Sequence, residues 1–338
     1  MSSERLSPHE LLRCDDVPAG LRARVLQAGN GRVLRLHLPA ARRWHPDVAS
    51  VVLKHVPDDA AGDHVFWPIA EHDFYVELAD DCGVRVPRLY AAERAGTGHG
   101  YRLLLEDLAP GGNVHGFLDC TLPEAEQAVE ALARLHARAW GKTTDAAYAA
   151  IPRHDAASLE AMLSEVRRLR PAFLARVAAA AGDALARALS ALLDEFDCGH
   201  EPRWQTPETL THGDFHRGNL IFADDGVAVL DWQAIRVHRG GVDLAFFLCS
   251  SLSSAGRRRF ERRLLAHYQR ALLEQGVGPL ELAALMQDYA RGLRCCLARA
   301  VYVIGSRRLD PAVEAGYCTH GLPRLAAALR DSVRADGG

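Results

Sequence analysis

Hydrophobic and polar positions follow strand-like patterns in the first third of the chain and helix-like patterns in most of the rest. In the N-terminal part, short apolar and β-branched runs predict strands. These runs are Arg22 to Ala28, Val33 to Leu38, Ser50 to Val56, Val84 to Tyr90 and Tyr101 to Leu105. Between the third and fourth runs, residues 69–78 carry the period of an amphipathic helix.

After residue 121, apolar positions recur every three to four residues, which is typical of helices. The predicted helices are Leu122 to Trp140, Ala157 to Leu169, Ala172 to Phe196, Arg258 to Gln275, Pro279 to Gly305 and Pro311 to Arg334. Thr121, with Glu124 three residues later, forms a capping signal for the first of them. His136 falls on its buried stripe and is interpreted as a core residue. We therefore predict an α+β fold, with a small sheet lobe containing one main helix and a larger, mostly helical lobe.

The stretch 210–233, LTHGDFHRGNLIFADDGVAVLDWQ, carries the strongest chemical signal. It places Asp214 in a loop, Asn219 five residues later, and Asp231 after a predicted hairpin. Phosphoryl transfer from a nucleotide needs one group that orients the attacking hydroxyl and oxygen donors that hold magnesium. The order of these three side chains suits that chemistry.

The predicted hairpin explains how Asn219 and Asp231 can meet. Its strands are 220–223 and 227–230, with Asp-Asp-Gly between them as a turn signal. A three-residue loop would put Asn219 directly opposite Asp231, whereas a two-residue loop would shift each to a neighbouring pair. In both cases the two side chains leave the open end of the hairpin together, with Cβ atoms about 5–8 Å apart.

The residues His212-Gly213-Asp214, Asn219 and Leu230-Asp231-Trp232 resemble the catalytic segment of the aminoglycoside phosphotransferase and choline kinase superfamily, which has a protein-kinase-like fold. The run 229–233 and the later Asp243 resemble most the ecdysteroid-kinase-like and phosphotransferase-family branch. The resemblance implies that Asp214 is the catalytic base or hydroxyl-orienting residue, and that Asn219 and Asp231 bind Mg²⁺. It also implies supporting roles for His212 and for Asp243, which would brace the catalytic loop.

The hypothesis that the chain is a kinase also requires a lysine on a strand and a glutamate on the following helix. The chain has only two lysines, at 54 and 142, and Lys54 lies in an apolar strand pattern. On the helix, Glu71 shares one face with apolar residues at its third, fourth and seventh following positions, and a carboxylate on such a face needs a cation. Glu77 is the competing choice but lies off that stripe. We therefore predict that Lys54 and Glu71 form an ion pair beside the nucleotide phosphates.

Two further segments are assigned to the nucleotide. Gly29 and Gly31 flank a tight turn where a kinase's nucleotide-covering loop would fall, although a plain hairpin turn explains the same residues. The resemblance places the interlobe hinge at Glu106, Asp107 and Leu108, whose backbone would bind the adenine ring. It divides the chain into a nucleotide-binding lobe (1–105), a hinge (106–115) and a helical lobe (116–338) that carries the catalytic loop and the acceptor site.

Composition narrows the function classes. The chain has 338 residues, a formal net charge of −3 and no basic arm, which argues against a nucleic-acid binder. It lacks a signal-like N-terminus and an apolar run long enough for a membrane span, so we expect a cytoplasmic protein without a membrane partner. The eight cysteines are scattered without zinc-type spacing and are expected to be reduced thiols.

We thus predict an enzyme that uses ATP and Mg²⁺ to phosphorylate a hydroxyl of a small molecule, such as an aminoglycoside-, choline-, sugar- or steroid-like alcohol. The sequence leaves open the acceptor, ATP against GTP, the role of His216 and the oligomeric state. Three alternatives remain: a non-catalytic nucleotide-binding module, a kinase of proteins, and a metal hydrolase built on His212, Asp214 and His216. The second lacks an activation-segment signature, since only twelve positions separate Asp231 from Asp243.

Overall fold

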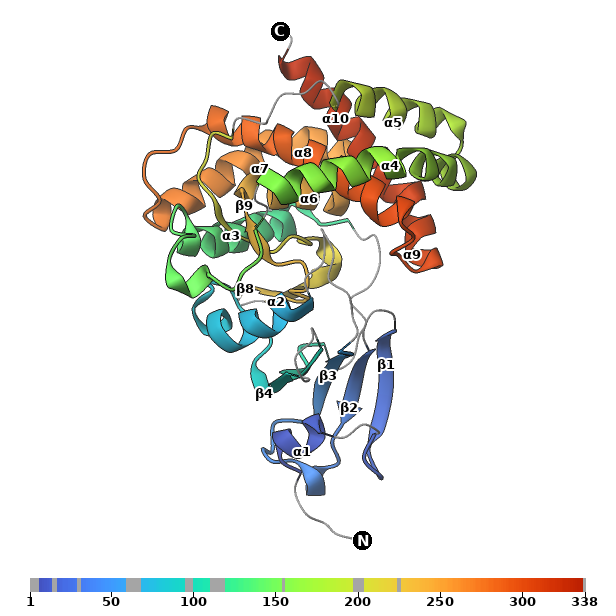
Figure 1. Cartoon of the computed structure of the whole chain (residues 1–338). Coiled ribbons are helices and arrows are strands. Elements are labelled where there is room, and N and C mark those ends of the chain that lie inside the picture. Colours follow the sequence, from blue (N-terminus) through green and yellow to red (C-terminus); the bar gives the residue numbers. More distant parts are fainter. Residues whose placement is uncertain are drawn as a thin grey trace.

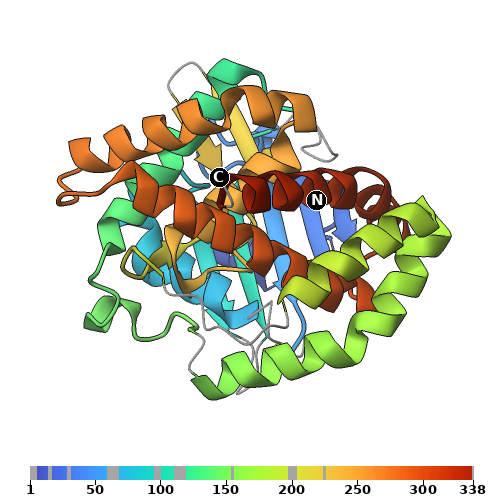
Figure 2. The same cartoon turned by 90° about the horizontal axis from the view of Figure 1, so that it is seen from above.

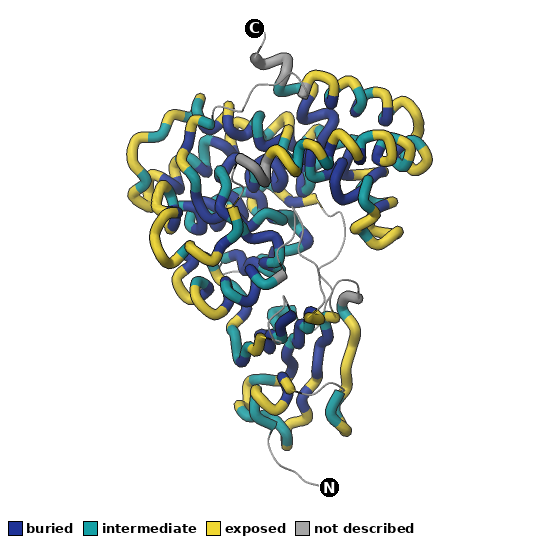
Figure 3. Tube along the Cα trace, in the orientation of Figure 1, coloured by how far each residue is buried: buried dark blue, intermediate teal, exposed yellow. Residues whose placement is uncertain are grey.

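The computed structural model describes residues 6–13, 17–28, 32–58, 68–94, 100–109, 119–153, 156–196, 204–223 and 226–336. It has two lobes, an N-terminal one built on a sheet and a C-terminal one built mostly of helices (Figure 1). Buried positions gather along the middle strands of the sheet and in the centre of the helical lobe (Figure 3). The predicted α+β architecture is confirmed.

The N-terminal lobe contains a five-stranded antiparallel sheet with the order β1-β2-β3-β5-β4. Its strands are β1 (Arg22–Ala28), β2 (Arg32–His37), β3 (Ser50–Val56), β4 (Leu89–Arg94) and β5 (Tyr101–Glu106). Lys54 belongs to the central strand, where it lies between Val33 of β2 and Leu103 of β5. The lysine is therefore fixed in the middle of the sheet, and it is 8% exposed.

The two faces of the sheet pack against different partners, because successive side chains of a strand point to opposite faces. One face packs against α1 (Pro8–Leu12). The short helix η1 (Ala40–Arg42) follows β2 in the chain. The other face packs against α2 (Pro68–Asp73), which continues as η2 (Phe74–Leu78) and η3 (Ala79–Asp81). This continuous helical segment is the main helix predicted for the lobe.

The fourth strand begins later than the sequence pattern suggests. We expected a strand over residues 84–90, but β4 begins at Leu89. Pro87 lacks an N–H and cannot donate into a strand ladder. Arg85 forms an isolated bridge with Ala228, and the backbone N–H of Val229 donates to the Arg85 carbonyl at 2.8 Å. The segment before β4 therefore ties the N-terminal lobe to the hairpin of the other lobe.

The C-terminal lobe consists of helices around four short strands in its described part. The helices are α3 (Leu122–Ala139), η4 (Ala146–Tyr148), α4 (Ala156–Ala181), α5 (Asp183–Phe196), η5 (Arg217–Asn219), α6 (Gly240–Ser251), α7 (Ser254–Glu274), α8 (Leu282–Gly305), α9 (Pro311–Gly316), η6 (Tyr317–Gly321) and α10 (Leu322–Asp336). The strands are β6 (Thr209–Thr211), β7 (Leu220–Ala223), β8 (Gly226–Val229) and β9 (Arg236–His238). In Figure 2, α4 and α5 lie along one edge of this lobe.

The break between α4 and α5 differs from the prediction. We expected two helices separated near Pro171, but α4 runs through that proline and ends at Ala181. Gly182 follows with a φ of 91°, a left-handed conformation that favours glycine and ends helices. The glycine, rather than the proline, sets the boundary.

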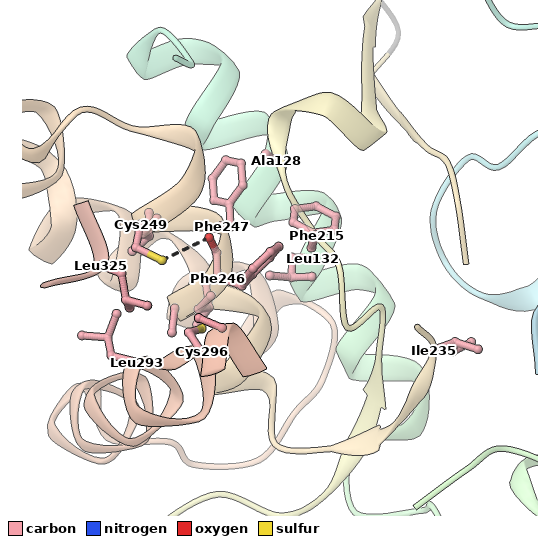
Figure 4. Close-up of a cluster of buried hydrophobic side chains, with 14 of the residues drawn as sticks. Ala128, Leu132, Phe215, Ile235, Phe246, Phe247, Cys249, Leu293, Cys296 and Leu325 are labelled. Atoms are coloured by element: carbon pink, nitrogen blue, oxygen red, sulfur yellow. Dashed lines mark hydrogen bonds between the residues drawn. The ribbon is translucent and has the colours of Figure 1, made fainter. Parts of the chain in front are cut away.

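Helices α6 and α8 approach each other closely through a pair of glycines. A Cβ atom added to Gly292 of α8 would lie 2.3 Å from the carbonyl oxygen of Gly241 of α6, so neither position accommodates a larger residue. Aromatic and aliphatic side chains fill the core around α6, with the rings of Phe247 and Phe215 5.5 Å apart (Figure 4). This core fixes the loop of residues 212–219, because the buried Phe215 directly follows Asp214.

Two expectations from composition bear on this architecture. Within the described ranges, no helix is both long and apolar enough to cross a membrane. The described cysteines, at 82, 120, 249, 295, 296 and 318, are all free thiols.

Candidate active site

Asp243 holds the loop of residues 212–219, which is the predicted catalytic loop, by hydrogen bonds to its backbone. The carboxylate of Asp243 is fully buried near the start of α6, and it accepts the backbone N–H groups of His212 at 2.7 Å and Gly213 at 2.9 Å. His136 Nε2 lies 3.2 Å from the same carboxylate, and its Nδ1 lies 2.6 Å from the Tyr268 hydroxyl. Asp243 thus accepts two backbone N–H groups of this loop, and its supporting role stays a prediction. His136 is buried in the core as predicted.

The turn at Gly213 requires a glycine. Its φ is 77°, and an added Cβ would lie 2.1 Å from the carbonyl oxygen of Ala234. This close backbone crossing brings residues 213–214 against the segment that follows Asp231. The sequence therefore places glycine where two functional stretches must touch.

The hairpin adopts the shorter of the two loops considered. Ala223 pairs with Gly226 and Leu220 with Val229, so the loop has two residues. Residues 224 and 225 lie outside the described part of the chain. The N–H of Leu230 donates to the Asn219 carbonyl at 2.8 Å, which makes Leu230 the partner of Asn219 and leaves Asp231 one position further on. Both Asn219 and Asp231 line the same cleft.

Asp231 adopts an unusual backbone conformation, with a φ of 62°. For a residue other than glycine, this left-handed conformation is uncommon, and aspartate and asparagine tolerate it better than most. The Oδ1 atom of Asp231 lies 2.8 Å from Lys54 Nζ, and Gln233 Nε2 lies 3.3 Å from its Oδ2. The kink turns this carboxylate towards the opposite lobe.

Lys54 forms the ion pair predicted with Glu71, at 2.6 Å, in addition to its contact with Asp231. Burial disfavours the charged ammonium, but Asp231 and Glu71 outweigh burial, and the pKa of Lys54 lies above its ordinary value. Glu71 is 1% exposed and also accepts from the Tyr101 hydroxyl at 2.5 Å and the Trp232 N–H at 3.2 Å. The competing Glu77 is exposed to solvent.

Asp214 is held from two sides. Arg299 of α8 donates to its Oδ1 at 2.7 Å, and the Asn219 amide donates to its backbone carbonyl at 3.0 Å. Burial raises the pKa of Asp214, but the neighbouring Arg299 and His216 more than reverse this effect, so its pKa is well below the ordinary range. Asp214 is thus a fixed anion that accepts hydrogen bonds.

The two histidines of the loop have different environments. His212 is fully buried, and its ring accepts from the Asp214 N–H at 3.2 Å through Nδ1 and contacts the Leu230 carbonyl at 2.9 Å through Nε2. Burial lowers the pKa of His212. An Nδ1 atom that accepts an N–H carries no proton of its own, which fits a neutral ring. The Nδ1 atom of His216 accepts from the Gly218 N–H at 3.0 Å, and its Nε2 lies 3.7 Å from Asp214 Oδ2.

These contacts disfavour the metal-hydrolase alternative. Both ring nitrogens of His212 are engaged within the loop, which leaves neither as a metal ligand. Among the described residues, no group of three or more His, Cys, Asp and Glu side chains is placed to share a metal ion. The oxygen donors at Asn219 and Asp231 instead match the preference of Mg²⁺ for one or two protein oxygens plus phosphate and water.

A cleft between the lobes collects most of the predicted nucleotide residues. It encloses about 820 Å³, counting space open to solvent. Its lining comprises Leu26, Val33, Arg35, Val52, Lys54, Glu71, Tyr75, Pro87, Leu105, Glu106, Asp107, Leu108, Ala109, Gly218, Asn219, Ile221, Leu230 and Asp231. Apolar side chains from β1, β2, β3 and β7 provide opposing walls suited to a planar ring. The cleft thus joins an apolar slot to a polar end at Lys54, Asn219 and Asp231.

The side chain of Asp107 contacts residues of the sheet. Arg35 of β2 lies 2.8 Å from Asp107 Oδ2, and Ser50 of β3 donates to the same oxygen at 2.7 Å. Arg35 also donates to the carbonyl of Ala109 at 2.5 Å. These contacts attach the predicted hinge to the sheet, and they leave only the backbone of this residue for the adenine contact that we predicted.

Some residues predicted to bind the nucleotide lie outside the described part of the chain. Gly29 and Gly31 lie outside the described residues, as do positions 110–118, which contain part of the predicted hinge. Glu106 and Leu108 line the cleft, and Glu106 accepts the Arg88 N–H at 3.2 Å. Arg299 and Arg35 carry no local sequence signal, because their partners lie 85 and 72 positions away.

A sequence profile described as "Phosphotransferase enzyme family" matches residues 22–285. The chain belongs to this family. It is therefore an enzyme of the phosphotransferase class, and the superfamily suggested by the catalytic segment is confirmed. The closer relationship to the ecdysteroid-kinase-like branch stays a prediction. A search of curated proteins finds no match to this chain.

Solved structures of this superfamily share the fold. A choline kinase from Cryptosporidium parvum has a TM-score of 0.58 at 10% identity, over 96% of this chain and 91% of its own. The choline kinase LicA from Streptococcus pneumoniae has a TM-score of 0.53 at 14% identity, over 94% and 95%. A spectinomycin phosphotransferase, solved with ADP and spectinomycin, also scores 0.53 at 14% identity, over 91% and 93%. The protein-kinase-like bilobal fold is thereby confirmed.

Proposed function

We propose that this phosphotransferase uses ATP and Mg²⁺ to phosphorylate a hydroxyl group of a small molecule. The observation that supports this most strongly is the contact across the cleft between Lys54 and Asp231, with Asn219 beside it. A lysine from the sheet lobe and oxygen donors from the helical lobe meet where the terminal phosphates of a nucleotide would lie. This arrangement fits phosphoryl transfer, in which positioning and charge stabilisation provide most of the catalysis.

Each residue has a definite task in this proposal. The carboxylate of Asp214 accepts a hydrogen bond from the acceptor hydroxyl, directs its oxygen at the terminal phosphorus and receives the proton. Lys54, held by Glu71, contacts the phosphates and steadies them. Asn219 and Asp231 would hold the metal, and bound Mg²⁺ would neutralise charge on the β- and γ-phosphates. The buried Asp243 keeps the loop in place.

The acceptor is a small molecule rather than a protein in this proposal. Only eleven residues separate Asp231 from Asp243, and they contain β9 and the first turn of α6. No loop remains there to bind an extended peptide. Structural neighbours with this fold include choline kinases and a spectinomycin phosphotransferase, which supports an alcohol of choline- or aminoglycoside-like type. Sugar- and steroid-like alcohols belong to the same proposal through the resemblance of the catalytic segment.

The nucleotide is assigned to the apolar slot, with the backbone of residues 106–108 available to its base. Cytoplasmic location is part of the proposal, since ATP is the phosphate donor. The proposal includes neither a nucleic-acid nor a membrane partner.

The proposal is tested with a panel of hydroxyl acceptors and Mg²⁺–ATP. ADP release should rise with at least one acceptor, and ³¹P NMR should show a new phosphomonoester that is absent when EDTA replaces Mg²⁺. A chain that binds ATP but forms no phosphoester with any acceptor class of the panel would be a nucleotide-binding module instead. GTP in place of ATP in the same assay identifies the preferred base.

A further inference from the structure

Arg299, a residue of α8 outside every sequence motif, contacts the catalytic loop at two points. Its guanidinium donates to Asp214 Oδ1 at 2.7 Å and to the Gly213 carbonyl at 2.5 Å. The same group lies over the ring of Phe246 in α6, with its central carbon 4.5 Å from the ring centroid. The Arg299 side chain is 18% exposed, so these contacts are partly shielded from solvent.

The position of Arg299 depends on the close packing of two helices. Gly292 of α8 lies two turns before Arg299 and contacts Gly241 of α6. Gly241 lies near Asp243, which holds the N–H groups of the loop. The helix pair therefore fixes both sides of the loop, with Asp243 on the N–H groups and Arg299 on the carbonyl and carboxylate.

The two oxygens of Asp214 are consequently different. Oδ1 is taken by Arg299, whereas Oδ2 lies 3.4 Å from the Asn219 amide and 3.7 Å from His216 Nε2. The latter contact is too long for a good hydrogen bond. An aspartate carboxylate otherwise rotates over a broad range, and a planar guanidinium bound at two points restricts that rotation.

We propose that Arg299 is a positioning residue that commits Asp214 Oδ1 and leaves Oδ2 as the oxygen that receives the acceptor hydroxyl. This inference rests on the proposed function. In the reaction, the acceptor oxygen forms a bond to the terminal phosphorus, and the bond from that phosphorus to the bridging oxygen of ADP breaks. The hydroxyl proton passes to Oδ2 of Asp214 and then to solvent, and ADP leaves with the bond's electron pair.

The geometry also explains why an arginine is used. Its rigid fork reaches the carboxylate and the carbonyl at the same time, and its flat face stacks on Phe246. A lysine at the same position has a compact ammonium that cannot reproduce the paired, planar contact. Charge alone should therefore restore only part of the effect of Arg299.

The test compares R299Q, R299K and R299A with R291Q. Arg291 is a matched control, because it lies on the same helix and pairs with the buried Asp288 at 2.9 Å without touching the catalytic loop. Mg²⁺–ATP turnover is measured with water and with the best acceptor of the panel. We expect kcat to fall by about 100-fold in R299Q, the loss typical of a misplaced reacting group, while ADP affinity and acceptor KM change little. R299K should recover part of kcat, and R291Q should retain the wild-type value.

Two further measurements separate positioning from a loss of structure. Free guanidinium ions at millimolar concentration should raise the turnover of R299A and leave that of R291Q unchanged. A crystal structure of R299Q should show the Asp214 carboxylate rotated away from its wild-type orientation. Wild-type kcat in R299Q, or an unmoved carboxylate in its crystal structure, would overturn the role of Arg299. Turnover that survives in D214N would instead overturn the proposed function, so the two failures are distinguishable.

Discussion

Lys54 Nζ lies 2.8 Å from Asp231 Oδ1, although 177 positions separate the two residues in the sequence. The lysine comes from the central strand of one lobe, and the aspartate follows the hairpin of the other. Because both line the cleft, the contact joins the two lobes where nucleotide phosphates are proposed to bind. In the proposed function, a bound nucleotide with its metal would offer each residue a new partner in place of this ion pair.

Lys54 can be tested against the only other lysine of the chain. In K54M, turnover should fall by about 100- to 1000-fold, because a preorganised charge that faces the transferred phosphate is lost. Lys142 is exposed, and K142M should behave as the wild type. ADP release under saturating ATP measures both variants. Similar rates for K54M and K142M would show that Lys54 has no role at the phosphates.

Glu71 should affect turnover through its ion pair with Lys54. E71Q retains the size of the side chain but removes the charge that pairs with Lys54 at 2.6 Å, so kcat/KM for ATP should fall by about 10- to 100-fold. E77Q, on the same helical segment but exposed, provides the control and should retain full activity. Equal losses in both variants would indicate a general effect on the helix.

Much of this arrangement could be predicted from the sequence because its signals are local. The hairpin, the Thr121 capping box and the apolar face beside Glu71 each depend on residues within a few positions. Loop length was the local feature that stayed open, since Asp-Asp-Gly suits a loop of two or three residues. The predicted start of β4 was wrong. Residues 84–88 have an extended pattern, but Arg85 in this segment pairs with Ala228 of the hairpin in the other lobe.

Long-range partners could not be predicted in the same way. Arg299 is one of many arginines in amphipathic helices, and only the Gly241–Gly292 packing brings it to Asp214. Asp107 could be placed at the hinge by resemblance, but its pairing with Arg35 and Ser50 depends on sheet register. A sequence pattern shows which face is buried and leaves the partner on that face undetermined.

The backbone of Asp231 provides a test that separates strain from chemistry. D231N should retain the fold, since asparagine tolerates a φ of 62°, but it should lose most turnover and require more Mg²⁺. D231A should be as inactive and in addition less stable by about 1–2 kcal/mol, because alanine is disfavoured in that conformation. Chemical denaturation and Mg²⁺ titration of turnover measure the two effects. Equal stability of D231A and the wild type would contradict the strain.

Asp243 should contribute to stability in a pH-dependent way. Burial raises the pKa of its carboxyl, but His136 and the backbone of the loop outweigh burial and hold its pKa below the ordinary value of 3.8. Its stabilising effect is therefore complete above pH 3.8 and is lost as the pH falls through the lower value of the folded state.

D243N removes that effect and places an amide N–H₂ against backbone donors. We expect a loss of about 1–3 kcal/mol in the free energy of unfolding at pH 7. The difference from the wild type should shrink as the pH falls below 3.8. Urea unfolding at a series of pH values measures it, and a difference that is constant down to the lowest pH would contradict the assignment.

The most direct test of the central claim is the turnover of D214N with Mg²⁺–ATP and the acceptor that gives the highest wild-type rate. Asparagine has nearly the same shape but cannot receive the hydroxyl proton, so the rate should fall by at least about 100-fold. ATP affinity, measured by calorimetry on the same preparation, should stay within a few-fold of the wild type. A D214N enzyme that phosphorylates the acceptor at the wild-type rate would contradict the account.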